Sequence, residues 1–232
     1  MTIKDKKVLI VLASNTETED PAQETQFWFQ ELALPYYALM NDGIQVELAS
    51  IDGGTVLPDL QTFLGAATQT KEVACFLEDR AAMLSLAETK PLHKLSTAHY
   101  KGIFLPGGHN TLWDFPENPY LNRLIEDFYA EKKPIAAIGH GQSALIGTEK
   151  NNGRPLVEGH KVSCFTNAEE KEIGCTDIVP FLLETKLRKL GGHFQAAATF
   201  QAHAVQDGML ITGQNPASSD MIVDLFKRSL YR

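Results

Sequence analysis

The segment at residues 132–145, KKPIAAIGHGQSAL, constrains the fold more than any other part of the chain. Its apolar residues 135–138 predict a short buried strand, and the glycines that follow predict a sharp turn. Residues 142–145 can then start a helix. Open α/β sheets bind ligands at this edge, where parallel strands end before helix N-termini. The turn has the geometry of a nucleophile elbow, with Gly139 at the position of the nucleophile.

A second turn of the same kind lies earlier in the chain. The apolar run GIFL at residues 102–105 leads directly into PGGHN. Because parallel strands end at the same edge of a sheet, the two turns together suggest one site. The backbone N–H groups of Gly108 and His140 could form an oxyanion-type pocket there. Glycine-rich turns are common in α/β folds, so two tight turns without function are the alternative interpretation.

The rest of the chain alternates strand and helix patterns. Strands are expected at residues 7–13, 44–49, 102–105, 135–138, 161–165 and 209–212. Helices are expected at residues 25–40, 118–132, 170–190 and 220–231, with a long and mostly helical segment at 59–90. This alternation predicts an α/β fold with a mostly parallel, doubly wound sheet. The absence of repeats and linkers favours a single domain over residues 1–232.

Composition excludes several classes of partner. The formal net charge is -8, and no run of Lys and Arg reaches four residues. Nucleic acid and anionic membrane surfaces are therefore not expected as partners. The first apolar run is too short for a signal peptide, and no run reaches membrane-spanning length. The three cysteines show no CxxC spacing, which favours a reduced, cytoplasmic protein.

A series of motifs then points to a known family. In chain order these are ELALPYY, DGG, PGGHNTLWD, IGHGQSAL, GRPLVEG, FTNAEE and GQNPAS, at residues 31–37, 52–54, 106–114, 138–145, 153–159, 165–170 and 213–218. Together they resemble the DJ-1/PfpI superfamily, the single-domain relatives of class I glutamine amidotransferases. Within it the chain looks most like the glyoxalase III-type heat-shock chaperone branch. The resemblance covers nearly the whole chain and implies a flavodoxin-like, three-layer α/β/α sandwich.

The resemblance also implies roles for individual residues. Members of this type use a cysteine nucleophile at the elbow, with the histidine that follows it as the base. A glutamate from the first helix contacts the cysteine, and an acid from a later loop orients the histidine. By position, these residues are Glu31, His140 and Glu170, with Glu169 as the competitor of Glu170. The position of the nucleophile falls on Gly139.

The chain thus departs from the family at the reacting atom. Without a side chain, Gly139 can form neither a thiolate nor a covalent intermediate. What remains is His140 as a general base on a bound water, with Glu31 as an acid or a clamp, or a pocket without this chemistry. Gln142 also replaces the usual proline of the family, and Asn110 its usual glycine.

The other cysteines are weaker candidates for a nucleophile. Cys164 lies in a predicted strand, where a cysteine is usually buried and inert. Cys75 falls in the helical segment, and Cys175 in a loop or helix start after Gly174. Both are interpreted as structural residues.

No cofactor is expected, and a metal site is not favoured. Glu31, His109 and His140 carry side chains that bind metals, but they lack tight ligand spacing. His109 could line the pocket or cap the helix that follows it.

Two functions of different classes follow. One is the enzyme of the resembled branch, a glyoxalase III-type lyase that converts methylglyoxal to lactate, or the related deglycation of proteins. The other is a stress-related binding protein or chaperone that keeps the pocket without the cysteine chemistry, which Gly139 favours. The expected partners are a small carbonyl compound or unfolded protein clients, and the resemblance implies a homodimer. A glutamine amidotransferase would need the same missing thiol and a synthase partner domain.

Overall fold

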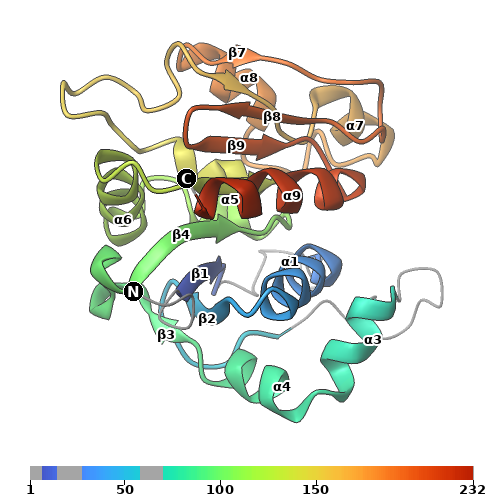
Figure 1. Ribbon diagram of the computed structural model, residues 1–232. Coiled ribbons are helices and arrows are strands. Elements are labelled where there is room, and N and C mark those ends of the chain that lie inside the picture. The colour runs from blue at the N-terminus through green and yellow to red at the C-terminus, as the bar shows by residue number, and fades with distance from the viewer. Residues whose placement is uncertain (1–6, 15–27, 58–69, 232) are drawn as a thin grey trace.

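A twisted seven-stranded sheet forms the centre of the computed structural model, which describes residues 7–14, 28–57 and 70–231 (Figure 1). The strand order is β3-β2-β1-β4-β5-β9-β8, and every neighbouring pair is parallel except β8 and β9. The strands are β1 (Lys7–Leu12), β2 (Gln45–Ser50), β3 (Lys90–Pro91), β4 (Tyr100–Leu105), β5 (Ile135–Ile138), β8 (Ala204–Asp207) and β9 (Leu210–Gly213). A second, two-stranded sheet pairs β6 (Lys161–Val162) with β7 (His193–Phe194).

Helices cover both faces of the large sheet. One face packs against α1 (Phe29–Asn41), α3 (Lys71–Glu78), α4 (Arg80–Ala87) and α9 (Ser219–Leu230). The other packs against α5 (Thr111–Asp114), α6 (Pro119–Ala130), α8 (Leu183–Lys189) and the 3₁₀ helix η5 (Gly141–Leu145). The remaining helices are α7 (Asn167–Glu172), η3 (Leu92–Lys94), η4 (Thr97–His99) and η6 (Pro216–Ser218). The predicted three-layer α/β/α fold is confirmed.

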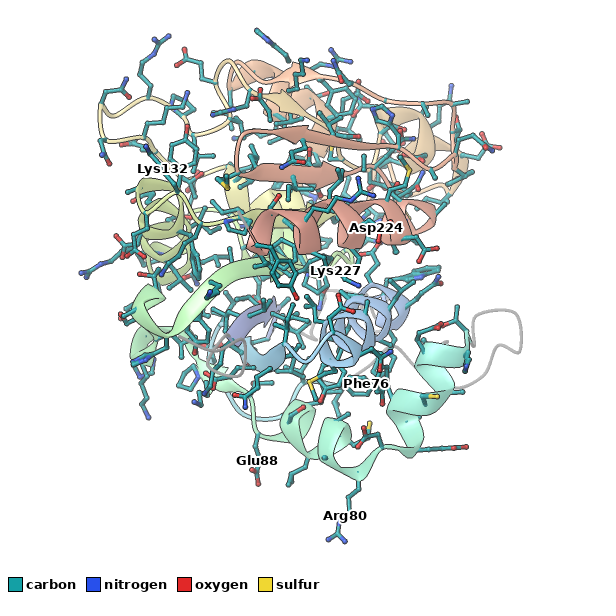
Figure 2. All side chains as sticks on the ribbon, viewed as in Figure 1. Phe76, Arg80, Glu88, Lys132, Asp224 and Lys227 are labelled. Carbon is teal, nitrogen blue, oxygen red and sulfur yellow. The ribbon has the colours of Figure 1, made fainter. Side chains whose placement is uncertain are left out.

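The apolar strands explain this layering. Successive side chains of a strand point to opposite faces, so Leu9 and Val11 join one core cluster while Val8 and Ile10 join the other. Strands buried on both faces have continuous apolar runs, as β1 and β5 do. On one face, Phe76 extends the layer by pointing from α3 toward α1 (Figure 2).

The segment expected to be mostly helical at residues 59–90 is so in its described part, whereas the single helix predicted at residues 170–190 is wrong in its extent. The described part of residues 59–90 contains two helices, because Asp79 ends α3 and its carboxylate caps the first N–H groups of α4; residues 59–69 lie outside the described ranges. Residues 170–190 also hold two helices, α7 and α8. A left-handed turn at Gly174 ends the first.

Other boundaries also differ. The strand predicted at residues 161–165 ends at Val162 and belongs to the small sheet, so Cys164 lies outside it. The edge strand β8 was not predicted. The first helix is seen from Phe29, and residues 25–27 of its predicted span lie outside the described part. The helix predicted to start after the elbow is the short 3₁₀ helix η5. None of the helices in the described ranges is long and apolar enough to cross a membrane.

Candidate functional site

The two glycine turns meet at the carboxyl edge of the sheet. A Cβ atom on Gly141 would lie 2.2 Å from the carbonyl oxygen of Leu105 and 2.8 Å from that of Pro106, so the elbow can approach β4 only as glycine. The Thr111 hydroxyl lies within hydrogen-bond distance of the carbonyl oxygens of Gly108, at 2.8 Å, and His140, at 2.9 Å, and can share its one hydrogen between them. One side chain therefore joins both turns.

Gly139 is fixed on both sides of its peptide unit. Its N–H donates to the Gly213 carbonyl, and its own carbonyl accepts from the Phe165 N–H, each at 3.0 Å. Its φ angle is +63°, a left-handed conformation that strains a residue with a side chain. A Cβ atom at this position would lie 3.0 Å from Glu31 Oε1. The position where the resemblance implies a thiol thus faces a carboxyl group.

Glu31 reaches this point from the first turn of α1. Its side chain is buried, and its Oε2 atom accepts a hydrogen bond of 2.6 Å from the Gly107 N–H. Burial raises the pKa of Glu31 to about 8, against the opposing effect of the hydrogen bond from Gly107. At pH 7 this carboxyl group is therefore mostly protonated and can donate a hydrogen bond.

Glu170 joins two histidines. One carboxylate oxygen forms a short hydrogen bond with His140 Nε2, and the other lies 3.3 Å from His109 Nε2. Burial alone would raise the pKa of Glu170, but the hydrogen bonds to His109 and His140 outweigh it and lower the pKa to about 2. Burial, reinforced by His109, lowers the pKa of His140 to about 4. At neutral pH the group is a carboxylate beside a neutral His140, whose Nδ1 keeps a lone pair when Nε2 donates.

The neighbouring carboxylate of Glu169 has a different surrounding. Its oxygens accept hydrogen bonds from groups of Thr166, Phe200, Gln214 and Asn215. None of these bonds involves His140. The geometry therefore pairs the predicted base with Glu170 and gives Glu169 the part of a structural anchor.

His109 lies at the edge of the site, with about a fifth of its side chain exposed. It stacks on His140 with ring centroids 4.2 Å apart, and it does not cap α5, whose N-cap residue Asn110 makes no side-chain capping bond. Gly108 is buried beside it. An oxyanion-type pocket formed by the N–H groups of Gly108 and His140 stays a prediction.

Gln142, which replaces the usual proline, ties three backbone segments together. Its amide nitrogen lies 2.7–3.0 Å from the carbonyl oxygens of Ala137, Ser163 and Gly213. These carbonyls belong to β5, β9 and the segment after β6. The Gln142 side chain thus links the strand ends around the elbow.

The cysteines differ in their access to the site. Cys164 is fully buried and donates to the Phe165 carbonyl, and burial raises the pKa of its thiol well above the ordinary value. Cys75 is exposed on α3. Cys175, by contrast, lies beside His109 and Glu170. The sequence predicted only a structural residue there and not a neighbour of the site. The signal in the sequence was the glycine that directly precedes Cys175.

Comparison with known proteins shows the family of the chain. The model of the DJ-1/PfpI family matches residues 6–227. Over 221 residues the chain is 28% identical to the glutathione-independent glyoxalase HSP31 of Saccharomyces cerevisiae, covering 92% of this chain and 93% of the relative. It is also 28% identical over 210 residues to the protein/nucleic acid deglycase HchA of Pseudomonas aeruginosa, covering 86% and 71%.

Solved structures give the same result. The Rapid Encystment Protein 24 kDa of Francisella tularensis superposes with a TM-score of 0.92 at 33% identity, over 98% of this chain and 100% of the other. Glyoxalase III of Candida albicans superposes with a TM-score of 0.89 at 24% identity, over 97% and 98%, and supports the shared fold. The chain therefore belongs to the DJ-1/PfpI family, in its glyoxalase III branch.

Proposed function

We propose that this chain binds small carbonyl compounds at the elbow without the covalent cysteine step that its family resemblance implies. The observation that carries the proposal is the geometry at Gly139, where a side chain would face Glu31 Oε1 at 3.0 Å and none is present. A hemithioacetal needs a thiolate at that point. The buried Cys164 has neither the exposure nor the pKa to supply it.

The remaining groups suit binding of a carbonyl group. A protonated Glu31 can donate a hydrogen bond to a carbonyl oxygen, and the lone pair of a neutral His140 can accept one from an adjacent hydroxyl. Glu170 keeps the His140 ring in one orientation through its hydrogen bond. Such a site would polarise a 2-oxoaldehyde or its hydrate, but would offer no side chain at residue 139 to attack it.

The central experiment compares three proteins. Lactate formation from methylglyoxal without glutathione is measured for the wild type, Gly139→Cys and Gly139→Ala. We expect no turnover above background for the wild type and Gly139→Ala, and measurable turnover for Gly139→Cys. Gly139→Ala is the matched control because it introduces the same Cβ atom and the same backbone strain without a thiol.

Binding is measured separately. Calorimetric titration with hydroxyacetone, a small ketone that lacks the aldehyde, should give saturable binding to the wild type and weaker binding to Glu31→Gln. Wild-type lactate formation equal to that of Gly139→Cys would reject the proposal.

The second candidate is a glyoxalase III-type lyase that works without a thiol. It is favoured by the pairing of a neutral His140 with Glu170, which leaves His140 able to accept a proton, and by the pKa of Glu31, raised to about 8, which keeps that carboxyl group protonated near neutral pH. In this reading His140 takes a proton from a bound water that adds to the aldehyde carbon C1, the hydrogen of C1 then moves to C2 as hydride, and Glu31 protonates the oxygen of C2. His140→Ala and Glu31→Gln should then both abolish wild-type turnover.

A chaperone role and a homodimer are also proposals. Apolar side chains near the site, those of Ile173, Ile178 and Phe200, are exposed and could contact unfolded clients or a second copy of the chain. Light scattering of a heat-unfolded client tests the first role. Sedimentation at micromolar concentration tests the second, and a monomer alone would reject the dimer.

A further inference from the structure

Three side chains that bind metals converge on the exposed side of the site. One ring nitrogen of His109, one carboxylate oxygen of Glu170 and the thiol sulfur of Cys175 all lie within 4.8 Å of one another. They come from the loop after β4, from α7 and from the loop that follows α7. This trio includes neither Glu31 nor His140, so it differs from the set considered from the sequence.

The end of α7 holds two of these residues together. Gly174 adopts a left-handed conformation with φ +74°, and its N–H donates to the Lys171 carbonyl. The N–H of Cys175 then donates to the Glu170 carbonyl at 2.9 Å. These two bonds form a Schellman motif, which turns the chain back on the helix. These backbone bonds place Cys175 beside Glu170.

We propose that His109, Glu170 and Cys175 bind one divalent transition-metal ion, with zinc as the preferred ion. Imidazole, carboxylate and thiolate are the ligands that zinc takes, and three of them leave a fourth position for water or a ligand. At tetrahedral zinc, neighbouring ligand atoms lie about 3.4–3.8 Å apart. The three ligand atoms lie within 4.8 Å of one another, so side-chain rotations need to close no separation by more than about 1.4 Å.

The surroundings also favour a cation. Glu170 and the thiolate of Cys175 would together balance the two charges of the ion. The second carboxylate oxygen of Glu170 bonds His140, and such outer contacts orient metal ligands. His109 and Cys175 are both partly exposed, so an ion can reach them.

Cobalt provides the first test, because a thiolate bound to Co²⁺ gives a near-ultraviolet charge-transfer band. Chelator-treated, reduced protein is titrated with Co²⁺ and then with Zn²⁺. We expect one equivalent of Co²⁺ per chain, with the charge-transfer band, and displacement by one equivalent of Zn²⁺. Cys175→Ser should lose the band, and His109→Gln should weaken binding by about tenfold or more. Cys75→Ser, which changes an exposed cysteine on α3, should behave as the wild type.

Alkylation provides a second test within one unaltered chain. Zn²⁺ should slow the reaction of iodoacetamide with Cys175 and leave its reaction with Cys75 unchanged, as followed by peptide mass spectrometry. An unaltered cobalt band in Cys175→Ser, or equal protection of both cysteines, would overturn the proposal.

The metal site goes beyond the proposed carbonyl binding. Cys175 takes no part in that function, so hydroxyacetone binding by Cys175→Ser separates failure of one proposal from failure of the other.

Discussion

The elbow at residues 138–141 and the α7 region at residues 166–175 meet at one site but are built in opposite ways. The elbow is held by its backbone, with hydrogen bonds on both sides of Gly139 and close contact at Gly141. The α7 region is held by side chains gathered around the buried Glu169. A region fixed by backbone packing can lose a functional side chain and keep its shape. A region fixed by side chains depends on each of them.

The largest expected effect tests the carboxyl group that the elbow buries. The pKa of Glu31 is raised to about 8 in the folded protein, against about 4.3 in an unfolded chain, so the folded state binds the extra proton between these values. The stability of the wild type relative to Glu31→Gln should therefore be greatest below pH 4 and fall as the pH rises to 8. The relative loss should be on the order of 5 kcal/mol.

Urea denaturation of both proteins at a series of pH values measures this difference. Because the comparison is between two proteins, the titration of other groups largely cancels. Parallel pH curves would show that Glu31 ionises normally and that the elbow does not enclose it.

The second prediction tests whether backbone contact defines the elbow. Gly141→Ala places a methyl group 2.2 Å from a backbone oxygen of β4, so the sheet edge must move. We expect a loss of about 3 kcal/mol in the free energy of unfolding, measured by urea denaturation. Gly43→Ala is the control, because its φ is +74° and a Cβ atom there meets nothing within 4 Å. Strain alone should cost it about 1–2 kcal/mol, and equal losses in the two variants would refute close contact at the elbow.

The same contrast explains what could be predicted from the sequence. The strand before the elbow was predicted with its observed bounds, because a proline precedes it and a glycine ends it, and both signals are local. The α7 region was predicted as one helix to residue 190, because its end depends on a single left-handed glycine. The order of strands and helices predicted the fold class, which depends on their alternation and not on exact bounds.

The site was harder to predict than the fold. Its glycine turns follow from the pattern of the sequence, but the pairing of Glu170 with His140 joins residues 30 positions apart and came from the family resemblance. Periodicity carries no information about such a contact between side chains. Cys175 was missed for the same reason, since its approach to His109 depends on how α7 ends and how its loop packs.

The third prediction tests the side-chain network of α7. In Glu169→Gln an amide group replaces one carboxylate oxygen and points a donor at existing donors, which should cost about 2 kcal/mol. Burial alone would raise the pKa of Glu169, but the hydrogen bonds to its carboxylate outweigh burial and lower this pKa. The stabilisation that the ionised Glu169 provides is therefore fully present above about pH 4.3, the unfolded pKa. It disappears as the pH falls through the lower pKa of the folded state.

Thermal or urea unfolding at pH 7 and at pH 3 measures this loss. Glu172→Gln, on the same helix and exposed, is the control and should change stability by less than about 0.5 kcal/mol. Equal losses of stability in the two variants would show that the Glu169 carboxylate does not anchor the α7 region.

The smallest effect should be the most local one. Thr166 caps α7 by accepting from the Glu169 N–H, while the Glu169 carboxylate accepts from the Thr166 N–H. Thr166→Ala should lower stability by about 1 kcal/mol, and so should Asn118→Ala at the start of α6, where the side chain also caps a helix. The two variants should differ in which helix loses protection from amide hydrogen exchange, α7 in Thr166→Ala and α6 in Asn118→Ala.

Amide hydrogen exchange separates them, because the N–H groups of Gly174 and Cys175 donate to carbonyls of α7 and report on the end of that helix. Both amides should exchange faster in Thr166→Ala and at the wild-type rate in Asn118→Ala. Since α7 has only six residues, loss of its first bonds should reach its last turn. Unchanged exchange rates of these amides in Thr166→Ala would mean that the turn at the C-terminal end of α7 is stable without the N-terminal cap. The turn after α7 that carries Cys175 would then resemble the elbow, with its geometry set by the backbone.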